Sequence, residues 1–138
     1  YDRALMDCID QYQPDLIVLA GFMRILSDEF VKHYHGRMIN IHPSLLPKYK
    51  GLNTHQRVLE AGEKEHGATV HFVIPELDSG PVILQGKLVI QAGESEQQLA
   101  DRIHKIEHQI YPQAISWFAE GRLILSDKHV LLDNKILN

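Results

Sequence analysis

The chain has 138 residues, a net charge of −4 at pH 7, an ordinary hydrophobic fraction of 44% and one cysteine. These values exclude a nucleic-acid-binding protein with a basic surface, a protein with an internal disulfide, and a membrane protein, since no apolar run approaches roughly 20 residues. We therefore expect a single domain over residues 1–138 in a cytoplasmic protein that is a monomer or a homodimer.

The first half of the chain alternates between helical and strand patterns. Apolar residues recur at helical spacing over residues 2–12, and the apolar run DLIVLAG (15–21) is typical of a buried strand. A short helix capped by Ser27 follows, and then the strand RMINIH. A proline-rich loop over 43–53 precedes a helix predicted over 54–61.

The second half continues this alternation. The strands GATVHFVI and PVILQGKLVIQ flank the turn-rich segment PELDSGP. Ser95 and Gln98 form a capping box at the start of a long helix, in which Pro112 is expected to cause a kink or to begin a second helix. The C-terminal segment RLILSDKHVLLDNKIL, the tail of the chain, predicts two or three short strands at the sheet edge. Strands that alternate with helices predict an α/β fold with a mostly parallel sheet.

In such sheets, ligands bind beyond the carboxyl ends of the strands. This rule places the loops after three predicted strands at one edge of the sheet. These loops present Met23 and Arg24, His42, and Asp78. His71 precedes the third loop and either lines the site or is a hydrogen-bonded core residue.

Asn40 and His42 lie two residues apart in one strand, so their side chains share a face about 7 Å apart. Imidazole can transfer protons near neutral pH, and a carboxamide can donate to a carbonyl oxygen that becomes an oxyanion. Asp78 would raise the His42 pKa by its opposite charge. These groups suit acyl transfer from an amide-like donor to an amine. Polar residues that only satisfy backbone groups at a strand end explain the same pattern equally well.

Four segments of the chain carry a resemblance to a known family. AGFMRIL, NIHPSLLPKYKG, VHFVIPELDSGPVILQ and EHQIYPQAISWFAEGRL together resemble the phosphoribosylglycinamide formyltransferases, a branch of the folate-dependent formyltransferase family. The pairing of HPSLLP with ELDSGP is specific for enzymes that use formyltetrahydrofolate. HPSLLPKY and EHQIYP indicate the glycinamide ribonucleotide branch.

The resemblance implies the formyltransferase fold, which is a Rossmann-like open sheet with flanking helices. It also implies transfer of a formyl group from the co-substrate 10-formyltetrahydrofolate to the amine of glycinamide ribonucleotide in purine synthesis, without a metal. In this assignment His42 transfers protons and Asn40 donates to the oxyanion. Asp78 keeps His42 protonated and helps to position a water molecule.

The resemblance further assigns substrate-binding residues. Those implied to bind folate are Met23, Arg24, Ile25, Leu26, Ile74, Pro75, Glu76, Leu77 and Asp78. Those implied to bind the nucleotide substrate are His104, Lys105, Ile106 and Glu107. The family begins with a strand and a Gly-Ser-rich loop that binds phosphate, and neither is found here. We therefore expect the N-terminal third to be missing, and the 138-residue chain alone to lack full activity.

Several alternatives remain open. A formyltetrahydrofolate hydrolase uses the same donor with water as the acceptor, but such hydrolases tend to have a second His where Pro43 stands. A methionyl-tRNA formyltransferase is another alternative, but it needs an added tRNA-binding domain. A catalytically incomplete folate- or nucleotide-binding module would be compatible with the expected absence of the N-terminal third. HKIEH (104–108) matches a zinc-protease pattern but needs a third ligand downstream, for which Asp127, His129 and Asp133 are the candidates.

Overall fold

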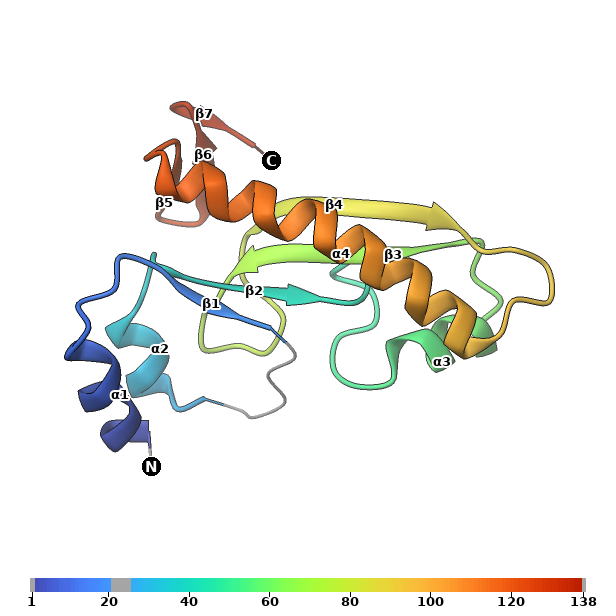
Figure 1. Cartoon of the computed structure of the whole chain (residues 1–138), viewed down its shortest axis with the longest axis horizontal. Helices are drawn as coiled ribbons and strands as arrows, with labels where there is room; N and C mark the ends of the chain where they lie inside the picture. Colours follow the sequence, from blue (N-terminus) through green and yellow to red (C-terminus); the bar gives the residue numbers. More distant parts are fainter. Residues whose placement is uncertain (1, 21–25, 138) are drawn as a thin grey trace.

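The computed structural model describes residues 2–20 and 26–137. Its helices are α1 (Asp2–Asp10), α2 (Asp28–His33), α3 (Thr54–Glu60) and α4 (Glu96–Ala119). Its strands are β1 (Ile17–Leu19), β2 (Met38–His42), β3 (Glu65–Phe72), β4 (Val82–Val89), β5 (Leu123–Ser126), β6 (His129–Leu132) and β7 (Lys135–Ile136). The predicted α/β architecture, an open sheet with flanking helices, is confirmed (Figure 1).

The main sheet is mixed, so the prediction of a mostly parallel sheet is wrong. Its strand order is β1-β2-β3-β4. β1 pairs with β2 in parallel, whereas the β2–β3 and β3–β4 pairs are antiparallel. Only residues 73–81, which contain no helix, separate β3 from β4. A parallel connection needs about a dozen residues or more, usually with a helix, so this short loop reverses the chain.

The direction of β3 changes where the next loop begins. His42, the last residue of β2, pairs with Thr69, whereas Phe72, the last residue of β3, pairs with Ile39 near the start of β2. The loop after β3 therefore leaves the sheet at the edge opposite to the ends of β1 and β2. The prediction that all three site loops leave one edge is wrong for this loop.

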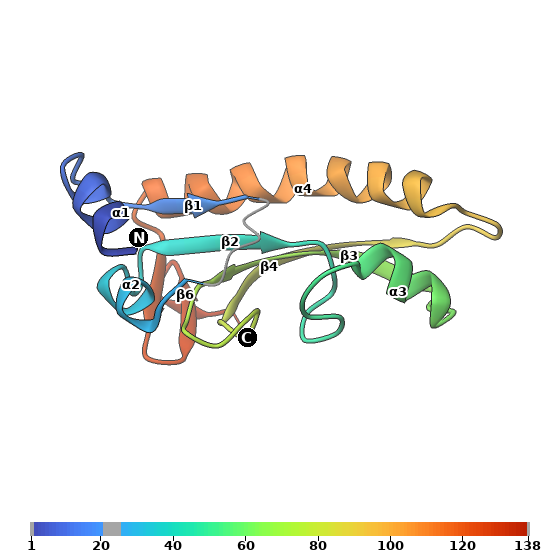
Figure 2. The same cartoon turned by 90° about the horizontal axis from the view of Figure 1, so that it is seen from below.

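Helix α4 covers one face of the main sheet (Figure 2). The core between them consists of buried apolar side chains from both, among them Ile39, Ile41, Val70, Phe72, Leu99 and Ile103. α4 runs unbroken from Glu96 to Ala119 with the exposed Pro112 inside it, so a second helix does not begin there. Burial of Tyr111 and Ala114 next to the proline offsets its cost in the helix, about 3 kcal/mol.

Tyr111 connects α4 to two strands of the sheet. Its buried hydroxyl contacts the carbonyl oxygen of Leu19 in β1 and that of Ile39 in β2, the latter at 3.1 Å. Burial raises the pKa of the Tyr111 hydroxyl, which keeps the group protonated as a hydrogen-bond donor. The parallel strand pair is thus held from the helix side.

Two smaller assemblies flank the main core. α1 and α2 enclose a second apolar cluster that contains Met6, Phe30 and Tyr34. Strands β5, β6 and β7 form a separate three-stranded antiparallel sheet. The prediction that the tail lies at the edge of the main sheet is therefore wrong. In the described ranges, no helix combines the length and apolar character needed to cross a membrane.

Candidate active site

Four polar side chains lie on the face of the main sheet opposite α4. The β2–β3 register places Asn40 opposite His71 and His42 opposite Thr69. Since strand side chains alternate between faces, these residues share one face while their apolar neighbours pack under the helix. Thr69, His71 and His42 are all buried. A buried polar face of this kind is the best-defined candidate for chemistry in the molecule.

Each ring nitrogen of His42 has a defined neighbour. Nε2 lies 2.8 Å from the carbonyl oxygen of Tyr49, so Nε2 carries a hydrogen and donates it. Nδ1 lies 3.5 Å from Oδ2 of Asp78, beyond hydrogen-bond length but within ion-pair range, and both side chains are only 7% exposed. Nδ1 is therefore the ring nitrogen that faces the carboxylate, and the one available for proton exchange.

Asp78 reaches His42 because the loop after β3 turns back across the polar face. Oδ2 of Asp78 also accepts the N–H of Gly51 at 2.9 Å, which joins this loop to the proline-rich loop. The φ of Asp78 is +49°, in the left-handed region that Asp and Asn enter more readily than most residues. The Asp78 carboxylate thus approaches the His42 ring over the polar face of the sheet, and not from the sheet edge at which β2 ends.

Gly80 allows the same loop to pack against β3. A Cβ atom at Gly80 would lie 1.6 Å from the carbonyl oxygen of Phe72 and 3.3 Å from Nδ1 of His71. The backbone N–H of Phe72 donates to the carbonyl oxygen of Pro81 at 3.0 Å. Only glycine fits at position 80 without a shift of the loop that carries Asp78.

Thr69 holds the proline-rich loop in place. Its hydroxyl donates to the carbonyl oxygen of Ser44 at 2.7 Å and accepts the N–H of Leu46 at 3.1 Å and Nε2 of Gln85 at 2.9 Å. The Leu46–Pro47 peptide bond, whose isomer the sequence leaves open, is cis. Sequence reasoning missed Thr69, although its position two residues before His71 in the same strand places both side chains on one face.

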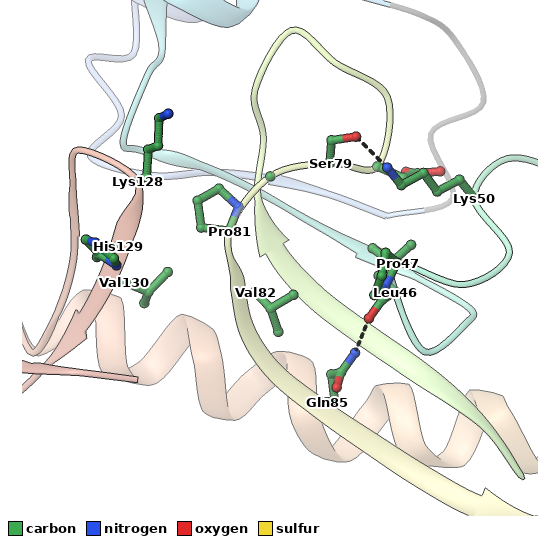
Figure 3. A pocket seen from close by; sticks show the side chains of 12 residues that line it. Leu46, Pro47, Lys50, Ser79, Pro81, Val82, Gln85, Lys128, His129 and Val130 are labelled. Carbon is green, nitrogen blue, oxygen red and sulfur yellow. Dashed lines mark hydrogen bonds between the residues drawn. The ribbon is translucent and has the colours of Figure 1, made fainter. Parts of the chain in front are cut away.

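Two cavities meet at Asp78. The smaller, of about 90 Å³, includes Asn40 and His71 in its wall. The larger, of about 480 Å³, lies between the proline-rich loop, the loop of Asp78 and the turn between β5 and β6. In the larger cavity Lys50 Nζ donates to Ser79 Oγ at 2.8 Å, and the other polar side chains do not converge on one point (Figure 3). The smaller cavity is therefore the stronger candidate for a reaction site.

The residues that the sequence assigns to folate divide into two groups. Leu26 and the run Ile74, Pro75, Glu76, Leu77 and Asp78 line the smaller cavity together with Asn40. Met23, Arg24 and Ile25 lie outside the described residues. The structure thus brings six of the nine assigned residues to the wall that also presents the candidate oxyanion donor.

The residues assigned to the nucleotide lie on α4. His104 and Lys105 are exposed, Ile106 packs against the core, and Glu107 is half-buried. Burial raises the pKa of the Glu107 carboxyl, although the nearby His104, His108 and His42 oppose this effect. Among the described residues, no hydrogen bond or ion pair joins these α4 side chains to the His42–Asp78 pair.

A pair of histidines joins α3 to β3. Nδ1 of His55 in α3 is 2.9 Å from Nε2 of His66 in β3, so one nitrogen donates to the other. Burial lowers the pKa of His66 from 6.5 to about 4, and the neighbouring His55 and His42 add to the effect. Burial also lowers the pKa of His55. The folded protein therefore holds His66 neutral.

We expect the free energy of unfolding to fall as the pH drops from 6.5 toward 4. The folded-state pKa of His66 is depressed, so the unfolded chain binds the proton first, and stability present above pH 6.5 is lost below it. The slope from this one group is at most about 1.4 kcal/mol per pH unit. Urea unfolding of the wild type and His66→Gln across this range measures it. The variant should show a flatter slope, while the exposed His35→Gln control should keep the wild-type slope. Equal slopes in all three proteins would contradict the assignment.

The HKIEH segment lies within α4, where the rings of His104 and His108 have centroids 6.5 Å apart. Across residues 2–20 and 26–137, no three His, Cys, Asp or Glu side chains gather into a group that could hold a metal ion. The two histidines therefore have no third ligand among those residues.

Comparison with known proteins agrees with this geometry. A family model described as "Formyl transferase" matches residues 1–115. A phosphoribosylglycinamide formyltransferase of Escherichia coli is 58% identical over 137 residues, which are 99% of this chain and 65% of the relative. The solved phosphoribosylglycinamide formyltransferase of Coxiella burnetii is 56% identical with a TM-score of 0.96, over 99% of this chain and 64% of that one.

A formyltetrahydrofolate deformylase of Pseudomonas syringae pv. tomato has a related structure. It is 28% identical with a TM-score of 0.88, over 94% of this chain and 44% of that chain. The chain thus spans just under two thirds of the bacterial formyltransferases it resembles more closely in sequence. Since the family model matches most of the sequence, this chain belongs to the formyl transferase family.

Proposed function

We propose that this protein transfers the formyl group of 10-formyltetrahydrofolate to the amine of glycinamide ribonucleotide in purine synthesis. The observation that carries the proposal is the buried His42–Asp78 pair beside Asn40, at a cavity walled by Leu26 and residues 74–78. Its apolar walls suit a flat pterin ring. The high identity to phosphoribosylglycinamide formyltransferases supports this branch of the family over the deformylase.

The chemistry follows from the positions of three side chains. The Asn40 amide donates to the formyl oxygen, which gains negative charge when the substrate amine attacks the formyl carbon. Asp78 accepts, through a water molecule, the proton that the attacking nitrogen loses. His42 gives its Nδ1 proton to N10 as the carbon–N10 bond breaks, which releases tetrahydrofolate and the formylated amine. Asp78 then favours the return of a proton to His42 Nδ1.

Glycinamide ribonucleotide and the folate are the proposed small-molecule partners. On α4, the Glu107 carboxylate can accept hydrogen bonds from ribose hydroxyls, and His104 and Lys105 can contact a phosphate. Met23, Arg24 and Ile25 remain part of the proposed folate site by their match to the family.

The direct test is to follow both products from 10-formyltetrahydrofolate, with glycinamide ribonucleotide present or absent. We expect one formylated glycinamide ribonucleotide for each tetrahydrofolate, and little tetrahydrofolate without the acceptor. The assay compares the 138-residue chain with a chain extended to the length of its relatives, of which this chain spans just under two thirds. Equal release of tetrahydrofolate without the acceptor would indicate a hydrolase, and folate binding without turnover an inactive binding module.

Asp78→Asn should lower kcat about 10²-fold with little change in KM for the folate. Asparagine can still accept the Gly51 N–H, but it lacks the charge that faces His42 Nδ1. Steady-state kinetics measure the effect. Asp127→Asn is a matched control, since Asp127 is exposed and has a similar left-handed φ of +56°. A kcat equal to that of the control would contradict the role of the carboxylate.

A further inference from the structure

Two buried acceptor atoms belong to residues that pair across β2 and β3. Oδ1 of Asn40 and Nε2 of His71 are buried and have no hydrogen-bond partner among the residues that the structure describes. The two residues are direct cross-strand neighbours, and both line the cavity of about 90 Å³. His71 is only 2% exposed. A buried polar atom without a partner is unfavourable by about 1–3 kcal/mol, so two of them on paired residues of one cavity need an explanation.

The hydrogen-bond pattern of His71 defines its tautomer. Nδ1 lies 2.9 Å from the carbonyl oxygen of Phe72, which can only accept, so Nδ1 carries the hydrogen. Burial lowers the pKa of the His71 ring, although the charge of Asp78 acts in the opposite direction. The neutral ring then has an unprotonated Nε2, which is an acceptor like Oδ1 of Asn40. Neither atom can satisfy the other.

The fold holds the His71 ring in this orientation. The β3–β4 register shifts between Val70 and His71, and such bulges re-aim side chains beside active sites. Gly80 closes over the Nδ1 side of the ring, because even a Cβ atom there would lie 3.3 Å from that nitrogen. The ring therefore cannot turn to present Nδ1 to Asn40 without breaking its bond to Phe72.

We propose that His71 is a positioning residue for formyl transfer, which acts through one water molecule that donates a hydrogen to Nε2 of His71 and a hydrogen to Oδ1 of Asn40. This water fixes the Asn40 carboxamide with its oxygen inward and its N–H groups toward the formyl oxygen. A cavity of about 90 Å³ has room for such a water, and one with two to four polar partners is a usual part of a folded protein. The inference rests on the proposed function.

Kinetics of the extended chain test the proposal. His71→Leu should lower kcat about tenfold with KM unchanged for both substrates, because the loss of one acceptor frees the Asn40 amide to rotate. His71→Gln, whose side-chain oxygen can replace Nε2 as the acceptor, should recover most of the activity. In an Asn40→Ala background, His71→Leu should have no further effect on kcat. Thermal unfolding of each variant verifies that it is folded, and His35→Leu is the matched surface control.

The opposite outcomes would overturn the inference. Equal losses from His71→Leu with and without Asn40 would indicate a structural role that does not pass through the carboxamide. A rise in KM for glycinamide ribonucleotide without a fall in kcat would mean that the substrate amine, not water, is the shared donor. Nitrogen NMR of the His71 ring near pH 7 should show Nδ1 protonated and Nε2 free, and the reverse tautomer would exclude the bridge. If the wild type does not transfer formyl at all, the proposed function fails, whereas transfer insensitive to His71→Leu contradicts only this inference.

Discussion

Replacing His42 with alanine should lower kcat for formyl transfer by about 10³-fold and leave folate affinity within about twofold. The imidazole is the group placed to give a proton to the departing nitrogen, since its Nε2 is held by the Tyr49 carbonyl and its Nδ1 faces Asp78. The folate walls come from other segments, so binding should survive. Steady-state turnover and equilibrium titration with a non-reactive folate measure the two quantities separately.

His35→Ala provides the matched control for this change. His35 is exposed after α2 and lines neither of the two cavities that meet at Asp78, so its loss should leave turnover unchanged. His42→Ala removes a buried side chain, so urea unfolding must show that the variant is folded at the assay temperature. A folded variant with wild-type turnover would refute the proton-transfer role of His42.

Gly80→Ala should lower the free energy of unfolding by about 3 kcal/mol and reduce formyl transfer at the same time. The new methyl group would lie 1.6 Å from the Phe72 carbonyl oxygen, and because both partners are backbone, the loop must move. Asp78 is two residues away and would move with it. Urea unfolding and turnover measured on the same preparation test both effects.

Gly93→Ala is the comparison for this second change. Gly93 has a φ of +73° and no atom within 4 Å of an added Cβ, so alanine there meets left-handed strain alone, about 1 kcal/mol. It should leave turnover unchanged, since Gly93 lies outside both cavities that meet at Asp78. If the two variants lose equal stability, the close packing of Gly80 on β3 is not what determines its cost.

Much of the fold could be predicted because most segments show a single clear periodicity. The capping box at Ser95 marks the start of α4, and the apolar run before Ala20 marks β1. Strand direction was harder, since alternation of strands and helices suggests a parallel sheet. The missing helix between β3 and β4 was the local signal for reversal. Continuity of α4 through Pro112 depends on burial against the sheet, which no local pattern reveals.

Part of the candidate site could be predicted because side-chain identity was enough. Asn40 and His42 follow from alternation along one strand, and the structure brings Asp78 within 3.5 Å of His42. The carbonyl of Tyr49 and the amide of Gly51 are backbone groups that any residue type supplies, so the sequence could not reveal them. The pairing of Asn40 with His71, whose buried Oδ1 and Nε2 atoms have no hydrogen-bond partner among the described residues, depends on strand register, which only the structure supplies.

The contact of Tyr111 with Leu19 and Ile39 also constrains the order of folding. The hydroxyl closes contacts over 92 and 72 residues of sequence, and contacts of such separation form late because long loops must close first. During synthesis, β1 and β2 leave the ribosome long before the helix that holds them together. The strand that carries Asn40 and His42 is therefore completed only after most of the chain has been made. A nascent chain that ends before α4 should expose the apolar face of the sheet, which α4 covers in the folded protein, to solvent and to chaperones.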